Sequence, residues 1–593
     1  MIMYRTDYCG TLTKADIGRE VKVCGWVQKQ RDLGTLIFVD LRDRTGIVQL
    51  AFDENKNEKE VFDRAFSVRS ETVVCAVGTV RSRGEGAINH DRATGEIEIE
   101  VREFEVLSVS ETPPFEIVEN SDVREELRFR YRYLDLRRPD IQRNIIERHK
   151  IVKLARDFFS DNGFLEIETP ILIKSTPEGA RDYLVPSRVH PGHFYALPQS
   201  PQIYKQILML SGYDRYMQIA KCFRDEDLRA DRQPEFTQLD LEMSFVTQDD
   251  VMEVNERFLA FLFEKYLGQK LELPLLRLPY EEAMARFGSD KPDLRYEMEL
   301  CDLSEVVRDC GFSVFSSTVQ GGGAVLGLCV KGGAETYSRK EIDRLTEFAK
   351  TYKARGLAYA RLTAEPTSSF AKFLTDAEYK AVLDTLGAET GDLVLIVADA
   401  RRRVAQTALG AVRTNVAAKL GLCDPKKFAL CWVTDFPMFE YSEEEDRYVA
   451  MHHPFTAPRD EDLQYLESDP ARVYAKAYDI VINGNEAGGG SERIHRRDVQ
   501  AKVFSALGIS DEEANEKFGF LLEAFRYGAP PHAGLAFGVD RLVSLLLGLD
   551  AIRDCIAFPK MQNAMELMSA APGTVPQKAL DELSISLNVK SDE

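Results

Sequence analysis

The sequence has no apolar run of the roughly 18 to 20 residues that a membrane helix needs, and its first residues show no basic stretch followed by an apolar one. Neither a membrane span nor a secretory signal is therefore expected, and the cytoplasm is the predicted location. The 10 cysteines stand singly, with no C-x-x-C pair and no histidines at zinc-finger spacing. We expect reduced and mostly buried thiols.

Positive charge is also scarce, because 76 lysines and arginines stand against 97 aspartates and glutamates and give a formal net charge of -21. Non-specific binding of nucleic acid needs basic residues gathered on one face, so a nucleic-acid partner would depend on local patches. Two common nucleotide-binding loops are absent as well, namely G-x-x-x-x-G-K-[ST] and a strand-linked G-x-G-x-x-G. A nucleotide site here must be built in another way.

The length of 593 residues is too great for one core and predicts three or four domains. From about Val21 to Val109, apolar and polar residues alternate in short runs, which predicts a small β-barrel. A five-stranded oligonucleotide-binding barrel fits this length, although composition does not distinguish it from other small barrels. Ile141 to Asn162 has helical spacing, and Ser289 to Cys423 has its own pattern, which predicts an inserted α+β domain. The expected domains are 1–110, 111–288, 289–424, 425–573 and a polar tail, 574–593.

The segment from Tyr216 to Phe245 reads as strand, long loop, strand. Because side chains alternate along a strand, the second strand has an apolar face, expected to pack inward, made of Leu239, Leu241, Met243 and Phe245. Its other face carries Gln238, Asp240, Glu242 and Ser244. A solvated face is the plain alternative, but Arg224, Glu226 and Phe236 are expected on the same side. A cation, several anions and an aromatic ring together suit a zwitterion plus a nucleotide.

Three segments resemble the motifs of class II aminoacyl-tRNA synthetases. Phe223-Arg224-Asp225-Glu226 followed by Phe236-Thr237-Gln238 resembles motif 2, Gly534 to Leu542 is similar to motif 3, and Gly163 to Pro170 is similar to motif 1. Their order along the chain is difficult to explain otherwise. The resemblance implies a multidomain α+β protein with an antiparallel-sheet catalytic domain, ATP as a substrate and, through motif 1, a homodimer.

In this family the motif 2 and motif 3 arginines act on the phosphates, which implies Arg224 and Arg541 as catalytic residues, and Phe236 stacks on adenine. The ATP-binding set implied is Arg224, Asp225, Glu226, Gln233, Phe236, Glu486, Gly538, Val539, Asp540 and Arg541. Asp479 and Glu486 resemble the carboxylates that hold Mg²⁺ on the phosphates of ATP. Since the two histidines of His452-His453-Pro454 point apart and lack a third ligand, we expect no metal there.

Within the class the chain resembles the bacterial-type aspartate-tRNA ligases, of which the inserted domain is a mark. A small acidic amino acid needs a cation for its side-chain carboxylate and acidic or amide groups for its ammonium. The resemblance assigns Lys205 and Arg493 to the carboxylate, and Asp240 with a closing loop over 176–182 to the ammonium. The full aspartate set implied is Glu178, Ser200, Gln202, Lys205, Arg224, Asp240, His452 and Arg493. The product would form through an aspartyl-adenylate.

For the tRNA, the resemblance implies anticodon contacts from the barrel residues Arg31, Phe38, Gln49 and Glu96. Leu33 is typical of relatives that charge only tRNA(Asp), whereas Gly86 resembles those that also accept tRNA(Asn), so both acceptors stay open. Asparagine and lysine ligases are disfavoured by the insertion and by the Lys205 and Arg493 pair. A non-catalytic RNA-binding protein is disfavoured by the motif arginines, and a tRNA-independent amide synthetase by the barrel.

Overall fold

The structure, a computed structural model, describes residues 4–176, 180–226, 232–443 and 445–589. The chain forms two compact units, one of Met1–Arg148 with Arg553–Gly573 and one of His149–Ile552 with Thr574–Glu593. Each unit has hydrophobic cores of its own. Among the described residues, no helix is long and apolar enough to cross a membrane.

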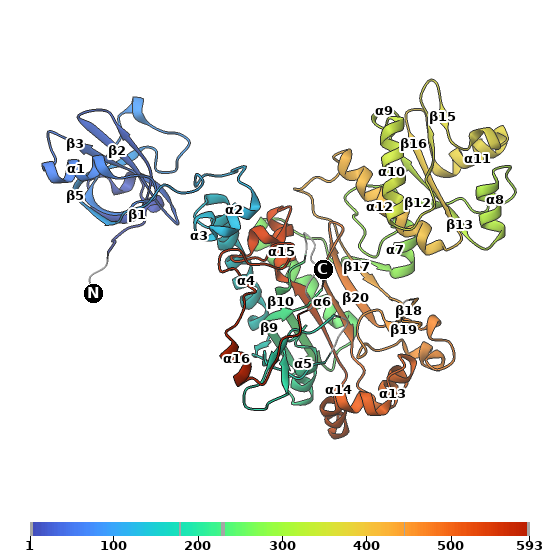
Figure 1. Cartoon of the computed structure of the whole chain (residues 1–593). Helices are drawn as coiled ribbons and strands as arrows, with labels where there is room; N and C mark the ends of the chain where they lie inside the picture. Colours follow the sequence, from blue (N-terminus) through green and yellow to red (C-terminus); the bar gives the residue numbers. More distant parts are fainter. Residues whose placement is uncertain (1–3, 177–179, 227–231, 444, 590–593) are drawn as a thin grey trace. The chain divides into compact units, whose positions relative to one another are not determined.

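The first unit contains a closed five-stranded barrel, which confirms the predicted N-terminal barrel (Figure 1). Its strands follow the spatial order β1-β2-β3-β5-β4. Their bounds are β1 Glu20–Asp32, β2 Leu36–Asp43, β3 Gly46–Asp53, β4 Val73–Ser82 and β5 Ile97–Ser108, with helix α1 (Lys59–Ser67) between β3 and β4. Alternate apolar side chains of every strand fill the interior, which is why the period of two was visible in the sequence.

Short helices and a C-terminal stretch complete the first unit. They are α2 (Glu125–Arg130), α3 (Arg132–Asp135) and the start of α4 (Pro139–Asp161), the last of which matches the helix predicted from Ile141. Arg132 is almost fully buried and donates hydrogen bonds to the carbonyl oxygens of Ile556 (2.8 Å) and Ala557 (2.9 Å). This contact ties the stretch after residue 552 to the helices that follow the barrel.

The second unit is built on an eight-stranded sheet in the order β11-β17-β20-β21-β22-β10-β9-β6 (Figure 1). The bounds are β6 Leu165–Glu166, β9 Arg215–Phe223, β10 Glu235–Ser244, β11 Leu276–Pro279, β17 Leu430–Thr434, β20 Ala477–Ile482, β21 Asn485–Glu492 and β22 His532–Gly538. The six inner strands are antiparallel to one another, and only the edge pairs β6–β9 and β11–β17 are parallel. The expected antiparallel catalytic sheet is therefore present.

Helices and two small hairpins surround this sheet. The helices are α5 (Gln202–Leu210), α6 (Gln248–Leu262), α7 (Tyr280–Phe287), α13 (Arg497–Ala506), α14 (Asp511–Ala524), α15 (Val539–Leu547) and α16 (Gln577–Glu582). The hairpins are β7 (Leu184–Pro186) with β8 (Phe194–Ala196) and β18 (Phe439–Ser442) with β19 (Arg447–Ala450).

One detail of the strand prediction is wrong. Leu239, Leu241 and Met243 are buried as expected, but Phe245 is 74% exposed. The strand β10 ends at Ser244, and Phe245 takes a left-handed conformation with φ 57° while its N–H donates to the Pro531 carbonyl at 2.7 Å. The chain turns at this residue, so the alternation of two no longer applies.

A second sheet of five strands, β12-β13-β16-β14-β15, interrupts the catalytic sheet in the sequence. Its elements are β12 Leu300–Asp302, α8 Ser313–Gln320, β13 Ala324–Val330, α9 Gly333–Thr336, α10 Arg339–Thr351, β14 Ala358–Arg361, β15 Thr367–Ser368, α11 Asp376–Leu386, β16 Leu393–Asp399 and α12 Arg402–Lys419. Residues of α10 and α12 pack on one face of this sheet, and residues of α8 and α11 on the other. All these elements fall inside the predicted insertion, whose limits stay a prediction.

Candidate functional site

Strand β10 runs through the candidate site and carries several of its side chains. One of its faces carries, in order, Phe236, Gln238, Asp240 and Glu242, as the period of two requires. Asp240 and Glu242 are 0% exposed, so this face is not the solvated surface that was the plain alternative. The strand lies between β9 and β22, whose residues are its direct partners.

Two buried cations meet these two carboxylates, and we call this cluster the charge box: Lys205, Arg493, Asp240 and Glu242. Lys205 Nζ lies 2.6 Å from Asp240 Oδ1 and 3.5 Å from Glu242 Oε2. Arg493 forms a fork on Glu242, with Nε at 2.9 Å from Oε1 and Nη2 at 3.0 Å from Oε2. Charges removed from water need such partners, because an isolated buried ion costs several kcal/mol.

The two carboxylates of the charge box differ in acidity. Burial raises the pKa of Asp240, and the nearby Lys205 ammonium offsets only part of this. Burial also acts on Glu242, but Arg493 and Lys205 together hold the pKa of that carboxyl below its usual value. Glu242 is therefore the firmly ionised partner, and Asp240 is the one whose surroundings favour an additional positive group.

Two polar atoms beside the charge box are buried and, among the described residues, have no hydrogen-bond partner: Asp240 Oδ2 and Gln202 Nε2. The first is an acceptor and the second is a donor. Buried polar groups are nearly always paired, so both atoms point to a ligand that brings a donor and an acceptor.

A glycine makes room for Glu242. A Cβ added at Gly534, on the neighbouring strand β22, would lie 2.1 Å from Glu242 Oε2 and 2.2 Å from the Leu241 carbonyl oxygen. Any side chain there would displace the fork between Glu242 and Arg493. The segment that resembles motif 3 thus contributes space to the charge box.

Arg493 has two further partners, and the sequence prediction named neither. Its Nη1 donates to Ser491 Oγ at 2.6 Å and lies 2.9 Å from His453 Nε2. Burial and the adjacent Arg493 hold the pKa of His453 well below its usual value, so the ring is neutral. The predicted histidine, His452, points elsewhere.

His452 contacts Asp479 instead of the charge box. Its Nε2 lies 3.7 Å from Asp479 Oδ1, and its ring packs edge-on against Phe436 with centroids 4.8 Å apart. Burial alone would lower the pKa of His452, but the Asp479 carboxylate raises it. Burial in turn raises the pKa of Asp479 to about 6.

A pocket at the other end of the β10 face collects most of the predicted ATP residues. Arg224 stacks on Phe236, with its guanidinium carbon 5.1 Å from the ring centroid, and Arg541 Nη1 donates to the Glu486 carbonyl at 2.5 Å. The pocket, which we call the nucleotide pocket after the residues predicted to bind ATP, is lined by Arg224, Glu226, Arg232, Gln233, Phe236, Gln238, Glu486, Ala487, Gly488, Ala536, Gly538, Asp540, Arg541 and Ile552. An aromatic face with several arginines suits a base and its phosphates.

Three predicted ATP residues have other surroundings. Asp225 lies 3.7 Å from Arg181 Nε and does not line the pocket. Val539 is buried at the start of α15. Asp540 does line the pocket, but its Oδ2 accepts the N–H of Thr237 at 2.9 Å, which ties the first turn of α15 to β10.

The predicted metal carboxylates stand on the hairpin of β20 and β21. Asp479 belongs to β20 and Glu486 to β21, and Glu486 lines the nucleotide pocket. In the part of the chain that the structure describes, no group of three or more His, Cys, Asp and Glu side chains could hold a metal ion. Two carboxylates without a third protein ligand match Mg²⁺, which keeps several waters and binds substrate phosphates.

The predicted closing loop is only partly described. Glu178 lies outside the described residues. After the gap, Ala180 is held by Gln199, whose Oε1 accepts the Ala180 N–H at 3.1 Å and whose Nε2 donates to the Ala180 carbonyl at 2.7 Å. Ser200 follows, and its Oγ accepts the N–H of Gln202 at 3.3 Å. Gln199 thus links the loop to the start of α5, which carries Lys205.

The barrel brings together three of the four predicted anticodon residues. Arg31 and Phe38 are direct partners across β1 and β2, and Arg31 Nη2 donates to Gln49 Oε1 at 2.7 Å. Glu96 is different, because its carboxylate pairs with Lys14 at 2.5 Å, while Glu98 accepts from Gln49 at 2.7 Å. Glu96 precedes β5, which begins at Ile97, whereas Glu98 lies within the strand, and the alternation of residues 96–101 in the sequence is the signal that could have found it.

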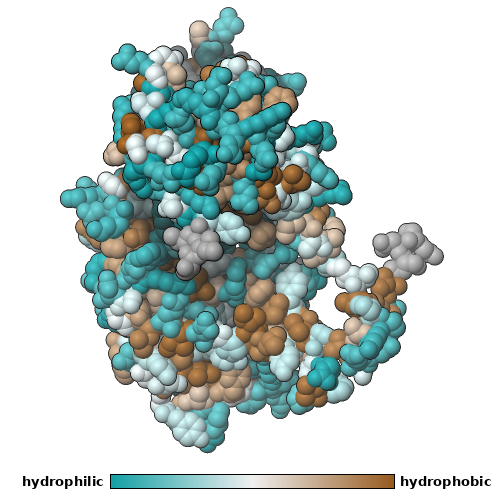
Figure 2. All heavy atoms as spheres, turned by 90° about the vertical axis from the view of Figure 1, so that its left-hand side faces the viewer, coloured by the Kyte–Doolittle hydropathy of each residue, from teal (hydrophilic) through white to brown (hydrophobic). Residues whose placement is uncertain are grey.

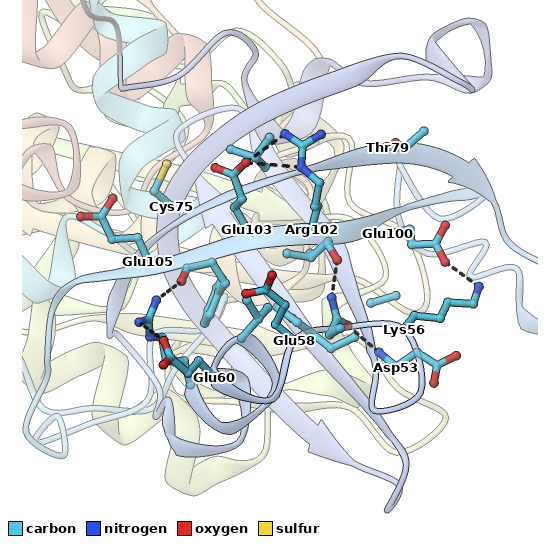
Figure 3. A pocket seen from close by; sticks show the side chains of 18 of the residues that line it. Asp53, Lys56, Glu58, Glu60, Cys75, Thr79, Glu100, Arg102, Glu103 and Glu105 are labelled. Atoms are coloured by element: carbon cyan, nitrogen blue, oxygen red, sulfur yellow. Dashed lines mark hydrogen bonds and ion pairs between the residues drawn. The ribbon is translucent and has the colours of Figure 1, made fainter.

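Further charged residues complete this barrel face. Arg31 lies 3.0 Å from Asp40, which also pairs with Arg92 at 2.8 Å. The Nε atoms of Arg31 and Arg83 are buried and, within the described ranges, lack a hydrogen-bond partner. A larger hollow of about 1220 Å³ lies elsewhere on the barrel, between α1, β4 and β5, and none of the predicted anticodon residues lines it (Figure 3).

The site residues that the sequence prediction missed are mainly partners of predicted residues. Glu242, Ser491 and His453 hold Arg493, Gln199 holds the closing loop, and Gln238 and Arg232 line the nucleotide pocket. Glu242 and Gln238 were predicted on the polar face of this strand from its period of two, but neither was assigned a role in binding. Ser491 and His453 gave no signal of their own.

Two family models match the chain. Residues 124–562 match tRNA synthetases class II (D, K and N), and residues 21–107 match the OB-fold nucleic acid binding domain. A protein of Ruminiclostridium cellulolyticum named aspartate–tRNA ligase is 60% identical over 98% of both chains. A protein of Lachnoclostridium phytofermentans named aspartate–tRNA(Asp/Asn) ligase is 56% identical over 100% of this chain and 99% of its own.

Solved structures show the same fold. The asparaginyl-tRNA synthetase of Pyrococcus horikoshii complexed with asparaginyl-adenylate superposes with a TM-score of 0.59 at 20% identity. The match covers 94% of this chain and 98% of that one.

Proposed function

The chain belongs to the class II tRNA synthetases of the D, K and N family, and we propose that it ligates L-aspartate to tRNA(Asp) with ATP, through an aspartyl-adenylate, at the site on β10. Aspartate and tRNA are the partners that this activity requires. The single observation that carries the choice of amino acid is the charge box with its two unsatisfied atoms, Asp240 Oδ2 and Gln202 Nε2.

Aspartate completes the hydrogen bonds that the charge box leaves open. Its ammonium would donate to Asp240, whose pKa is raised by burial and only partly lowered again by Lys205. A ligand carboxylate would accept from Gln202 Nε2. The ammonium would then replace Lys205 as a partner of Asp240, and Lys205 would bind the side-chain carboxylate of the ligand. Arg493, which Glu242 and His453 hold in place, would bind the same carboxylate. Asparagine would leave a buried cation without its anion, which is costly.

The order of residues along β10 supports the reaction. Phe236 and Gln238 line the nucleotide pocket, and Asp240 and Glu242 belong to the charge box. Neighbouring residues on one face of a strand are about 7 Å apart. An amino acid at the box and ATP at the pocket would therefore meet between these positions. The α-carboxylate would attack the α-phosphate, and Arg224 and Arg541 would stabilise the charge that develops there.

Mg²⁺ fits this site. Glu486 in the pocket wall and Asp479 on the paired strand would hold it, and the ion would neutralise charge on the ATP phosphates. His452, which pairs with Asp479, would keep that carboxylate in position. Glu178, in the loop that Gln199 anchors, would reach the ammonium, as the family resemblance implies.

The barrel would bind the anticodon. Arg31, Phe38 and Gln49 present a guanidinium, a half-buried ring and an amide, and Arg31 Nε and Arg83 Nε are buried donors without an acceptor within the described ranges. Unstacked bases offer ring faces and hydrogen-bonding edges of this kind. Glu96 would take part only after leaving Lys14.

A second candidate is a relaxed enzyme that also charges tRNA(Asn). It is favoured by the names of several relatives at 54 to 56% identity, which include both acceptors, and by Gly86, which has open space around it. Leu33, 68% exposed at the end of β1, is the feature that favours the strict enzyme. The tRNA assay below separates the two.

A homodimer through motif 1 is part of the proposal. The short strand β6 forms an edge of the eight-stranded sheet, and apolar residues in and after it are half exposed: Leu165 (50%), Ile171 (49%) and Leu172 (51%). Figure 2 shows apolar residues gathered in groups on one face of the molecule. An open edge with apolar side chains is suited to burial against a second copy. The cytoplasmic location stays a prediction.

The test is aspartylation of tRNA(Asp) and tRNA(Asn) transcripts with ATP and Mg²⁺, with asparagine as the control amino acid. Charging of tRNA(Asp) alone supports the strict enzyme, and charging of both transcripts supports the relaxed one. Charging of neither, with normal aspartate-dependent exchange of pyrophosphate into ATP, would remove the tRNA assignment but keep the activation site. Loss of exchange as well would overturn the proposed function.

A further inference from the structure

The hairpin of β20 and β21 forms one wall of the nucleotide pocket and turns at Asn483 and Gly484. After the turn, Glu486, Ala487 and Gly488 line the pocket. Both turn residues have positive φ, 51° and 78°, which is the geometry of a tight two-residue hairpin turn. The turn is not free in solvent, because Asn483 is only 8% exposed.

The chain that returns from the insertion holds this turn on one side. Asn483 accepts the N–H of Ala429 through Oδ1 at 2.8 Å and donates through Nδ2 to the Lys427 carbonyl at 3.0 Å. Its own N–H donates to the Ala429 carbonyl at 3.0 Å. Three hydrogen bonds therefore join the turn to the segment that leads into β17.

The chain that leaves for the insertion holds the turn on the other side. A Cβ at Gly484 would lie 2.9 Å from Asp293 Cβ, so the two residues are in close contact. Arg295 fixes the Asp293 carboxylate with Nε at 3.0 Å and Nη2 at 2.7 Å, and its Nη1 donates to the Asp424 carbonyl at 3.2 Å. The outgoing and returning connectors are thus bound to each other and to the turn.

A buried arginine of the insertion fixes these connectors. Arg413 on α12 is 1% exposed and donates to the carbonyls of Met298 (2.8 Å), Asp293 (2.9 Å) and Tyr296 (3.2 Å). Its guanidinium carbon also lies 4.3 Å from the centroid of the Tyr296 ring. The same helix buries Leu409, Val412 and Val416 in the core with β13 and β16. Arg413 is therefore part of the folded body of the insertion.

We propose that the inserted domain braces the nucleotide pocket, with Arg413, Asp293 and Asn483 as positioning residues that hold the β20–β21 turn and, through it, the wall that carries Glu486. The path is continuous, from the α12 core to Arg413, to the connector carbonyls, to Asp293 and the turn. None of the three positioning residues lines the pocket. The proposal rests on the proposed function only for the identity of the ligand, ATP.

A brace of the nucleotide pocket differs from general structural support because its loss should affect ATP binding but not aspartate binding. Loosening the turn should weaken ATP binding and speed opening of the hairpin, while the charge box, built on β10 and α5, keeps its affinity for aspartate.

The first test is Asn483→Gly. Glycine accepts the positive φ of the turn, so only the two side-chain hydrogen bonds are lost. We expect the KM for ATP in pyrophosphate exchange to rise about five- to tenfold, since each bond contributes a few-fold, with the KM for aspartate within twofold of wild type. Hydrogen exchange of the amides of 478–487, measured without ligand, should accelerate by a similar factor.

The matched control is Asn120→Gly. Asn120 has the same φ of 51°, but its side chain is exposed in the first unit. The control should leave both KM values and the exchange of 478–487 unchanged.

The second test acts from within the insertion. Arg413→Lys removes the planar fork that bridges several carbonyls, and Arg402→Lys, at the exposed start of α12, is its control. We expect Arg413→Lys to raise the KM for ATP, and the double variant with Asn483→Gly to show less than the product of the single effects, because both loosen one brace.

The proposal is overturned if Asn483→Gly leaves the hydrogen exchange of 478–487 and the KM for ATP unchanged, or if the KM values for ATP and aspartate rise together. The proposed function fails in a different way, since the wild-type chain would then show no aspartate-dependent exchange at all. The hydrogen-exchange measurement needs no activity and keeps the two outcomes apart.

Discussion

The charge box and the barrel face are built from the same parts but are exposed differently. Each has a carboxylate that is 0% exposed and paired with arginine, Glu242 with Arg493 and Asp40 with Arg31. In the box the cations are buried too, at 3% exposure for Arg493 and Lys205, whereas Arg31 is 39% and Arg92 25% exposed.

This difference in the exposure of the cations matches the difference in size between the two proposed ligands. A fully buried cation has no water to replace a missing anion, so the box can reject a small ligand that lacks one charge. A half-exposed arginine is solvated when free and can still reach a large partner such as an unstacked base. Selectivity should therefore be strict at the box and graded at the barrel.

The largest effect is expected from Arg224→Ala, in the nucleotide pocket. Removing a cation that faces developing charge on phosphate should lower pyrophosphate exchange about 1000-fold. The fold should survive, because Arg224 stacks on Phe236 and lies outside the box. Exchange at saturating ATP and the unfolding midpoint are the measurements.

The control is Arg215→Ala at the start of β9, the strand that ends one residue before Arg224; the Arg215 guanidinium carbon lies 5.7 Å from the Phe164 ring centroid. It should leave exchange nearly normal. Near-normal exchange in Arg224→Ala would remove this residue from the catalytic set.

The parts of this architecture that depend on a single helix or strand could be predicted from the sequence. The barrel strands, α4 and the alternating faces of β10 follow from local periodicity. The pairing of β10 with β22 could not be derived from periodicity, because residues 238 and 538 are brought together only by the folded sheet. The resemblance to known motifs implied an antiparallel sheet but named no strand pair, so this pairing comes from the structure.

The contacts of individual site residues depend on the tertiary fold in the same way. Adjacent side chains point apart, so only the fold decides that His453 contacts Arg493 and His452 contacts Asp479, and the role of His452 beside the substrate stays a prediction. Asp225 was included with Arg224, but its bridge to Arg181 turns it from the pocket. The Phe245 error reflects a turn whose left-handed residue is bulky and therefore gives no glycine signal.

The second prediction tests the burial of the box cations. Glu242→Gln leaves Arg493 without its anion and removes the more distant of the two anions beside Lys205, and it should lower the free energy of unfolding by about 3 kcal/mol. Urea unfolding measures this, and the KM for aspartate should rise in parallel. Glu282→Gln is the control, because its pair with Arg286 at 2.9 Å is exposed and should contribute less than about 0.5 kcal/mol. Equal losses in the two variants would contradict the comparison.

The third prediction concerns pH. The pKa of His453 is lowered in the folded chain, so below about 6.5 the unfolded chain binds a proton that the folded chain does not. His453 therefore makes the free energy of unfolding fall as the pH drops from about 6.5, by up to about 1.4 kcal/mol per pH unit. His453→Gln should be less sensitive than wild type over pH 6.5 to 5.5, because the other groups are common to both. Parallel curves would show that this ring is protonated in the folded protein.

The smallest effect is expected at the barrel, from Asp40→Asn. The carboxylate is as buried as Glu242, but its partners Arg31 and Arg92 reach solvent, so water can replace the lost anion. We expect a loss of about 1 kcal/mol in the free energy of unfolding and a severalfold rise in the KM for tRNA, with pyrophosphate exchange unchanged. A loss as large as that of Glu242→Gln would show that burial of the acid alone sets the cost. The exposure of the cations would then no longer explain the stricter ligand selectivity that is expected at the charge box than at the barrel.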